Sequence, residues 1–366
     1  MREPGDVRRQ RILAVVQSRG AVRVTDLASE LEVSVVTARR DVEELAREGK
    51  LRRGHGIARP VTAASEPAVP PAFRPAAPGG PVAVVVPERH TYLYETMNGA
   101  REVLEAAGLR IVLHIAPQAP GAERPIVERA LADGAQGLLF APRWRTAALQ
   151  EADGEWLTRT GVPTVLMERR PRPGSPLHTV DSVCSDHWHG MHLAVEHLLS
   201  LGHRRIVLAA RDDSPTARAI RAAFAEIVAA RPEIEDSLVV LSAQSAGTEP
   251  GAVVPDSLAE LLRERGATAA VLHGDVDALM LVQHLADNGV RVPDDCSVVA
   301  YDDVVAALGS TPLTAIAPPK AEVGRVAAEL LLHRLDSAGR ASARSPRRVE
   351  LLPELKVRGS TRTLSV

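Results

Sequence analysis

The apolar positions of the first sixty residues recur at spacings of three and four, a period that predicts amphipathic helices. Residues 7–20 place Ile12, Val15 and Val16 on one stripe. Gly20 follows the last of them, where glycine is typical of a helix C-cap. The pattern therefore predicts a first helix that ends at this glycine.

A second helix, a turn and a third helix are predicted next. Thr25 stands at the expected N-cap of a helix whose apolar residues are Leu27, Ala28 and Leu31. After the turn EVS, Ser34 stands at the N-cap of the third helix. This order indicates a helix-turn-helix.

The third helix has two distinct faces. Its buried stripe is predicted to consist of Val35, Ala38, Val42 and Leu45. Its outer face is predicted to consist of Val36, Arg40 and Arg47, flanked by Thr37 and Arg39. Gly49 ends the helix, and LRRGHGIAR then predicts two short strands with Arg52, Arg53 and His55 near the tip. We interpret the whole as a winged helix-turn-helix.

Beyond residue 81, short Val/Ile/Leu runs alternate with amphipathic segments. PVAVVVP, RIVLHIA, GAQGLLFAP and VPTVLME each carry four or more apolar residues, as parallel strands covered on both faces do. HRRIVLAA, DSLVVLS, TAAVLHG and CSVVAYDD repeat the pattern. The α/β alternation predicts two doubly wound parallel sheets in two lobes, with a ligand site beyond the carboxyl ends of the strands.

Composition separates these two parts. Residues 60–81 hold seven prolines and no helical or strand period, which predicts an extended spacer. We therefore expect a winged helix-turn-helix domain at 1–59, a linker at 60–81 and a two-lobed domain at 82–366. Residues 1–59 carry 13 Lys/Arg against 9 Asp/Glu, a net charge of +4, whereas the whole chain has a net charge of -2 and the remainder therefore -6.

A basic helix with an open outer face fits duplex DNA, where phosphate contacts position a protein and base contacts specify sequence. We expect Val36 and Thr37 near base edges and Arg39 and Arg40 on phosphate or guanine. The same surface is expected to include Thr25, Ser34, Lys50 and the wing residues Arg52, Arg53 and His55. The alternative is that the arginines pair with Asp41, Glu43 and Glu44 on a solvated face.

Other chemistry is poorly supported by the residues. Four histidines of CSDHWHGMHLAVEH lack one shared helix face and a completing ligand, so no metal site is expected, and Asp186 is interpreted as an N-cap. The two cysteines have no partner motif, and no nucleotide-binding or nucleophile motif occurs. We expect no catalytic residue, no cofactor and no membrane span, and a cytoplasmic location.

The head resembles the N-terminal domain of DeoR-type regulators. The resemblance rests on RRQRIL, the VS..T.RRD core and the LRRxHG wing, and it covers nearly all of the head. It implies sequence-specific DNA binding by a winged helix-turn-helix.

The body resembles the lactose/galactose repressor family, whose core is similar to periplasmic sugar-binding proteins. The motifs are EHLLSLGHRRIVLAA, SPTARAIRAAF, DNGVRVPDDCSVVAYDD, STPLTAIAPP and PELKVRGST. The resemblance implies a homodimer whose hinge responds to a sugar or nucleobase-like effector. It divides the core into lobe one, about 82–180 plus 318–345, and lobe two, about 181–317 plus 346–366.

Three binding residues follow from this resemblance: the acidic residue after the fourth strand is Glu168, the Arg of S..AR is Arg218, and the first Asp of the aromatic-Asp-Asp turn is Asp302. Carboxylates and a guanidinium suit the hydroxyls of a polyol. Two tyrosines could stack on a ring, and one Asp follows VLHG: these are Tyr92, Tyr94 and Asp275.

The chain also departs from the family. Gly274, Ala141 and Pro318 stand where polar residues are usual, and the proline-rich spacer replaces the family's hinge helix.

The sequence leaves two functions open. The first is a transcriptional repressor whose affinity for DNA responds to a small polyol. The alternative is a cytoplasmic sugar-binding or sugar-modifying protein whose basic head docks a protein partner.

Overall fold

The structure is a computed structural model of the whole chain. It describes residues 8–9, 12–13, 15–16, 22–31, 33–47, 50–54, 57–60, 79–88, 93–242, 255–336 and 345–364. The chain divides into two compact units, residues 1–72 and 73–366, and each unit is described by itself.

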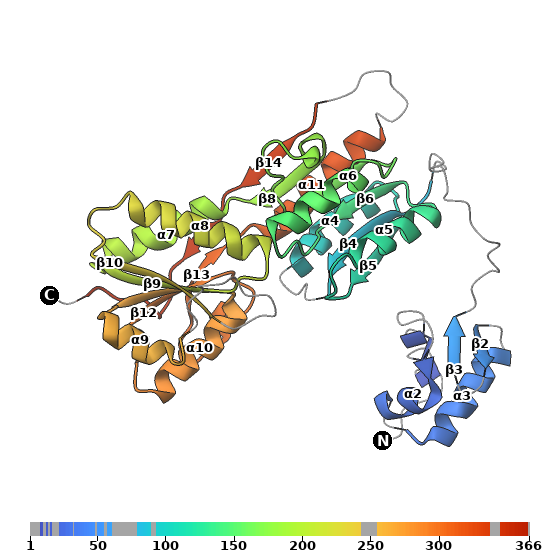
Figure 1. Cartoon of the computed structure of the whole chain (residues 1–366), viewed down its shortest axis with the longest axis horizontal. Helices are drawn as coiled ribbons and strands as arrows, with labels where there is room; N and C mark the ends of the chain where they lie inside the picture. Colours follow the sequence, from blue (N-terminus) through green and yellow to red (C-terminus); the bar gives the residue numbers. More distant parts are fainter. Residues whose placement is uncertain are drawn as a thin grey trace. The chain divides into compact units, whose positions relative to one another are not determined.

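The N-terminal unit is a small α/β domain (Figure 1). Its described elements are β1 (Val22–Arg23), α2 (Val24–Glu30), α3 (Val35–Arg47), β2 (Leu51–Gly54) and β3 (Ile57–Pro60). The strands form an antiparallel sheet in the order β1-β3-β2, in which β2 and β3 make the predicted hairpin. Ile12 and Val16 of the first predicted helix join its buried core.

Two local predictions in this unit are wrong and one is confirmed. The Ser34 hydroxyl accepts a hydrogen bond from the Thr37 amide at 3.1 Å, so Ser34 is the N-cap of α3. Thr25 is instead the second residue of α2, whose N-cap is Arg23. Val35 is 40% exposed because it lies in the first turn of α3, whereas the core contacts begin at Ala38.

The C-terminal unit holds two six-stranded sheets, one in each lobe (Figure 1). The lobe-one sheet has the order β14-β8-β7-β6-β4-β5, and all of its neighbours are parallel. Its strands are β4 (Val82–Pro87), β5 (Ile111–Ala116), β6 (Gly137–Phe140), β7 (Thr164–Met167), β8 (Asp181–Ser185) and β14 (Arg348–Leu351). Its helices are α4 (Tyr94–Ala106), α5 (Glu123–Ala132), α6 (Ala147–Leu157), η2 (Pro176–Thr179) and α11 (Lys320–Leu335).

The lobe-two sheet has the order β10-β9-β11-β12-β13-β15, and only β15 runs antiparallel to its neighbour. Its strands are β9 (Arg205–Ala210), β10 (Asp236–Leu241), β11 (Ala269–His273), β12 (Ser297–Tyr301), β13 (Thr314–Ala317) and β15 (Glu354–Lys356). Its helices are α7 (His187–Ser200), α8 (Pro215–Ala229), α9 (Leu258–Arg265), α10 (Asp275–Asp287) and η3 (Ala306–Leu308).

Each sheet is buried on both faces, which explains the unbroken apolar runs of its central strands. In lobe one, α4 and α11 cover one face, and they approach closely because both contribute a glycine. A side chain on Gly99 would collide with the Ala321 carbonyl, and one on Gly324 with the Thr96 carbonyl. The two-lobed parallel α/β fold is therefore confirmed.

The chain crosses between the lobes three times, after β8, after β13 and after β14. Both β8 and β14 belong to the lobe-one sheet, where β8 pairs with β7 on one side and β14 on the other. The expected lobe boundaries, which placed residues from 181 and from 346 in lobe two, are wrong by one strand in each case. Hydrophobic pattern predicts a strand but does not say which sheet it joins.

Candidate functional site

The N-terminal unit exposes the start of α3. Val36 is 77% exposed, and Arg39 and Arg40 are exposed as well. The Thr37 side chain is half-buried, and its hydroxyl lies 2.8 Å from that of Ser34. A helix that presents its first turns to solvent in this way has the geometry with which helix-turn-helix domains enter a major groove.

The buried carboxylate of Asp41 takes its cationic partners from the first helical segment. Its oxygens accept from Arg8 Nε at 2.5 Å and lie 3.9 Å from Arg9. Within the described residues, no ion pair joins Arg39 or Arg40 to an acidic side chain. The solvated-face alternative, in which the arginines pair with Asp41, Glu43 and Glu44, therefore holds among the described residues only for Arg47, which pairs with Glu44 at 2.6 Å.

The remaining residues predicted to contact DNA are placed only in part. Thr25 and Lys50 are exposed. Arg52 and Arg53 lie on β2, the first strand of the hairpin. His55 lies outside the described residues.

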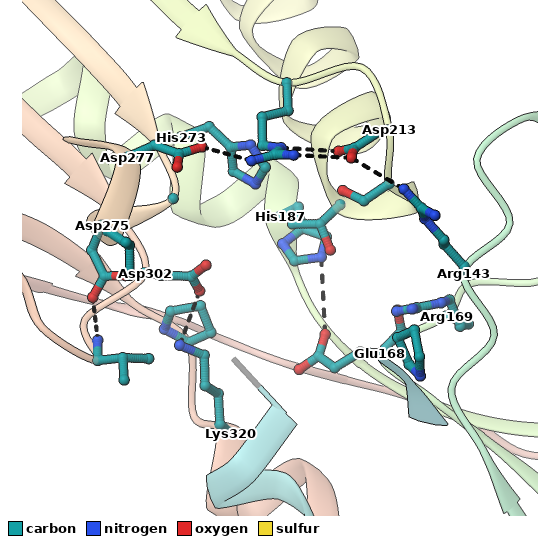
Figure 2. A pocket seen from close by; sticks show the side chains of 18 of the residues that line it. Arg143, Glu168, Arg169, His187, Asp213, His273, Asp275, Asp277, Asp302 and Lys320 are labelled. Carbon is teal, nitrogen blue, oxygen red and sulfur yellow. Dashed lines mark hydrogen bonds and ion pairs between the residues drawn. The ribbon is translucent and has the colours of Figure 1, made fainter. Parts of the chain in front are cut away.

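The C-terminal unit contains a cavity of about 330 Å3 between its lobes, at the carboxyl ends of the strands (Figure 2). This volume falls within the ordinary range for small-molecule sites. Its charged and imidazole-bearing lining residues are Arg143, Glu168, Arg169, His187, Arg211, Asp213, His273, Asp275, Asp277, Asp302 and Lys320. Lobe one supplies three of the cations and one carboxylate, and lobe two supplies four carboxylates and one arginine, so the two walls differ in charge.

Glu168 and Asp302 occupy equivalent places in the two lobes. Each directly follows a strand, β7 or β12, and each has a left-handed backbone, with φ of 52° for Glu168 and 81° for Asp302. Non-glycine residues rarely adopt this conformation, and such outliers cluster at functional sites. Each carboxylate also faces the first residue of the helix that follows an interlobe crossover, His187 or Lys320 (Figure 2).

Lys320 and Asp302 form a buried ion pair across the lobes, with Nζ 3.0 Å from Oδ1. Burial by itself lowers the pKa of Lys320, but the charge and hydrogen bond of Asp302 outweigh burial and raise the pKa above its ordinary value. Lys320 is therefore an ammonium at neutral pH.

A second set of ion pairs joins the two lobes near the carboxyl end of β9. Arg211 bridges Asp213 and Asp277 within lobe two, at 3.1 Å from each, and Arg143 of lobe one lies 3.4 Å from Asp213. Burial by itself raises the pKa of the Asp213 carboxyl, but the hydrogen bonds and charge of Arg211, followed by Arg143, bring the pKa below its ordinary value.

Asp275 holds a turn of the cavity wall in place. One of its oxygens accepts hydrogen bonds from the backbone amides of Val304, Val305 and Ala306, the first two at 2.5 Å. Three amides on one oxygen leave its second oxygen as the atom able to accept from a ligand.

Two histidines that line the cavity contact the buried Tyr301. His187 Nδ1 lies 3.0 Å from the Tyr301 hydroxyl, and the His273 ring packs edge-on against the Tyr301 ring. Burial lowers the pKa of both histidines, so both rings are neutral at pH 7. Burial also holds the pKa of the Tyr301 phenol well above its ordinary value.

The structure brings together only some of the predicted effector residues. Glu168, Asp275 and Asp302 all line the cavity. Arg218 is not among its lining residues; its Nη1 instead donates across the lobes to the carbonyl of Trp144, at 2.7 Å, and to that of Arg145.

The two tyrosines do not complete a stacking site. Tyr94 is 61% exposed at the start of α4 and is not among the cavity-lining residues. Tyr92 lies outside the described residues.

Sequence reasoning missed most of the cationic lining residues and both histidines. Each of Arg169, Arg211 and His273 lies within two residues of the carboxyl end of a parallel strand. His187 and Lys320 begin the helices after the crossovers. The rule that ligands bind at strand ends would have found Arg169, Arg211 and His273, had it been applied to every strand and not only to family motifs.

The histidines of α7 serve separate purposes. The Asp186 carboxylate accepts from the His189 amide at 2.9 Å, so its predicted role as an N-cap is confirmed. His192 stacks on Trp188, and His197 bonds to Thr361. In the described part of the chain, no three potential ligands gather as a metal site, and no described helix has the length and apolar character of a membrane span.

Comparison with known proteins gives two domain matches. Residues 8–63 match the DeoR-like helix-turn-helix domain. Residues 195–361 match the periplasmic binding protein-like domain. The two matches fall on the two structural units.

Similar proteins include two bacterial regulators. An arabinose metabolism transcriptional repressor from Geobacillus stearothermophilus is 27% identical over 345 residues, which cover 93% of this chain and 90% of the relative. The transcriptional regulator DegA from Bacillus subtilis is 27% identical over 301 residues, which cover 78% and 81%. A LacI family regulator from Enterococcus faecium, solved with bound ribose, has the same fold, with a TM-score of 0.60 and 23% identity over 78% of this chain and 99% of that one.

Proposed function

Because this chain joins a DeoR-like helix-turn-helix domain to the periplasmic-binding-protein-like core of LacI-family transcriptional regulators, we propose that it represses transcription from a palindromic operator, as a homodimer, under the control of a small polyol. Operator binding is assigned to the N-terminal unit. The polyol is assigned to the cavity between the two lobes.

The observation that carries the DNA-binding part is the exposed first half of α3. Val36 and Thr37 lie in the first turn of α3, and we assign them to base edges. We assign the exposed Arg39 and Arg40, which follow on the same helix, to phosphate or guanine. Asp41, the one buried acid of this helix, is already neutralised by Arg8. Among the described residues, Arg39 and Arg40 pair with no acidic side chain, so their charge is available to a phosphate.

The effector class is supported by the cavity chemistry. Glu168, Asp275 and Asp302 present carboxylate oxygens to it, and carboxylates accept hydrogen bonds from hydroxyls. Ribose bound to the Enterococcus faecium regulator agrees with a polyol ligand in a core of this fold. Closure of two walls around such a ligand couples binding to the angle between the lobes.

Two titrations test this function. Fluorescence anisotropy should show that the full chain prefers its own upstream duplex over heparin, with an affinity that falls steeply as salt rises. Thermal-shift measurements with ribose, glucose, sucrose and cellobiose should find a sugar that raises the melting temperature. Equal affinity for duplex and heparin contradicts the repressor.

The alternative, a sugar-modifying enzyme whose head docks a protein, requires turnover. A general acid and base need free, opposed groups, whereas Asp302 is held by Lys320 and Glu168 by Ser185. We therefore propose a cytoplasmic regulator without enzymatic activity. Release of product from the bound sugar by the purified chain would overturn this.

A further inference from the structure

His187 stands at the first interlobe crossover with both ring nitrogens facing polar groups. It is the first residue of α7, and it lines the cavity together with Glu168. Nδ1 lies 3.0 Å from the Tyr301 hydroxyl, in lobe two. Nε2 lies 3.9 Å from Glu168 Oε2, in lobe one (Figure 2).

The contact with Tyr301 determines the tautomer. The Tyr301 phenol is fully buried, so its O–H needs an acceptor, and His187 Nδ1 is the partner found among the described residues. A nitrogen that accepts a hydrogen bond carries no proton. A neutral ring then has its proton on Nε2, which makes Nε2 a donor toward Glu168.

The Tyr301 hydroxyl has room beside α7 because residue 190 is a glycine. A side chain on Gly190, one turn along α7, would bring its Cβ to 2.6 Å from that hydroxyl and 3.0 Å from Ile316. Any larger residue therefore displaces Tyr301 from His187.

Glu168 is fixed equally firmly. Its Oε1 accepts from the Ser185 hydroxyl at 2.8 Å and its Oε2 from the Ser185 amide at 3.2 Å. The donor on His187 and the acceptor on Glu168 are thus both held in place, yet their separation of 3.9 Å is too long for a hydrogen bond. One oxygen atom at ordinary hydrogen-bond distance from both fits between them.

We propose that His187 and Glu168 together bind one hydroxyl group of the effector across the two lobes, with Tyr301 as the positioning residue that keeps the His187 proton on Nε2. The hydroxyl accepts from Nε2–H and donates to the carboxylate. An analogue without that hydroxyl leaves Nε2–H without an acceptor and removes one donor from Glu168, so this couple determines specificity. This inference rests on the proposed polyol effector.

The test compares variants of the full chain by calorimetric titration with the tightest-binding sugar among ribose, glucose, sucrose and cellobiose, and with its monodeoxy analogues. His187→Phe should weaken sugar binding at least about tenfold, since it removes the Nε2–H donor to the bound hydroxyl. His187→Gln, which keeps a donor near the Nε2 position, should recover part of the loss. His189→Phe, a control on the same helix, should change nothing, and all variants should keep the duplex affinity of the wild type.

One deoxy analogue should bind the wild type weakly, and its affinity should not fall further in His187→Phe. The hydroxyl that this analogue lacks is then the one bound by His187. Nitrogen NMR of selectively labelled histidine should show the Nε2–H tautomer for His187 in the wild type and its loss in Tyr301→Phe. A wild-type Nδ1–H tautomer, or equal sugar affinity in His187→Phe and the wild type, overturns the inference while leaving the repressor intact. Failure of every sugar to bind overturns the polyol effector and this couple together.

Discussion

The Arg218 guanidinium of lobe two donates a hydrogen bond of 2.7 Å to the backbone carbonyl of Trp144 in lobe one. The Trp144 backbone has φ of 27°, its indole is buried, and the indole Nε1 donates to Asp153 at 2.7 Å. Arg143, from the same loop, reaches back to Asp213 in lobe two. One arginine from each lobe therefore contacts the other lobe, and Arg218 joins the two lobes without lining the cavity.

Arg218→Ala is expected to loosen the loop that carries Trp144, because two carbonyls lose their donor. In a Trp188→Phe background, which removes the exposed indole, acrylamide should quench tryptophan fluorescence more strongly than in the parent. Arg221→Ala, on the same helix, is the control and should leave quenching unchanged. Unaltered quenching in Arg218→Ala would show that this hydrogen bond does not hold the loop.

Lys320→Met is expected to destabilise the core by about 3–5 kcal/mol, because it leaves the Asp302 carboxylate buried without its counter-ion. The double variant Lys320→Met/Asp302→Asn should recover most of that loss. Urea unfolding followed by circular dichroism measures both. If the single variant is as stable as the wild type, solvent must already screen the pair.

Asp41→Asn is expected to destabilise the N-terminal unit by a similar amount, about 3–5 kcal/mol, since Arg8 loses its buried partner. DNA affinity should fall as the unit unfolds, although Asp41 itself is buried away from the exposed face of α3. Anisotropy against temperature separates the two effects: cooling should restore binding. Binding that stays weak at low temperature would instead place Asp41 in the interface.

Arg39→Ala and Arg40→Ala are each expected to weaken duplex binding and to reduce its salt dependence. The slope of log affinity against log salt should become shallower by about 0.9 for each phosphate that the variant no longer neutralises. Arg47→Ala is the matched control, because Arg47 lies at the end of α3 and pairs with Glu44. If Arg47→Ala weakens duplex binding as much as the other two variants, the DNA interface is not confined to the start of α3.

Asp303→Asn is expected to lower the melting temperature at neutral pH and to flatten its decline in acid. Burial by itself raises the pKa of Asp303, but Arg358, at 2.8 Å, and Lys356 outweigh burial and bring the pKa below the ordinary value of 3.8. A lowered pKa contributes stability above about pH 4 that is lost as the pH falls through the folded-state value. The gap between wild type and variant should therefore be constant from about pH 7 to 5 and close below about pH 4, as calorimetric scans would show; a gap that persists in acid would assign the loss to packing.

Much of the fold was predictable because it rests on local pattern. The capping role of Ser34 and the buried stripe from Ala38 to Leu45 follow from residue type and helical period. Val35 has the right spacing for that stripe, yet it is 40% exposed in the first turn of α3. Spacing predicts a face, and only packing decides how far along the helix that face is covered.

The candidate site likewise contains residues that the sequence predicted and residues that it did not. Glu168 and Asp302 were predicted from the family resemblance, at positions that directly follow apolar strands, and both line the cavity. Their partners, His187 and Lys320, were not, because each lies 19 or 18 residues away in sequence and on another element. A contact of this kind depends on where a crossover brings the chain back, which no local period records.

The sequence by itself determined a basic helix-turn-helix, a proline-rich spacer and two parallel α/β lobes, since short-range periodicity and composition carry that information. The tertiary structure alone decided that β8 and β14 complete the lobe-one sheet, that Arg218 bridges the lobes, and which donors face the cavity carboxylates. These are contacts between segments far apart in the chain. Their geometry is set by how whole sheets pair and close, and not by the residues next to them.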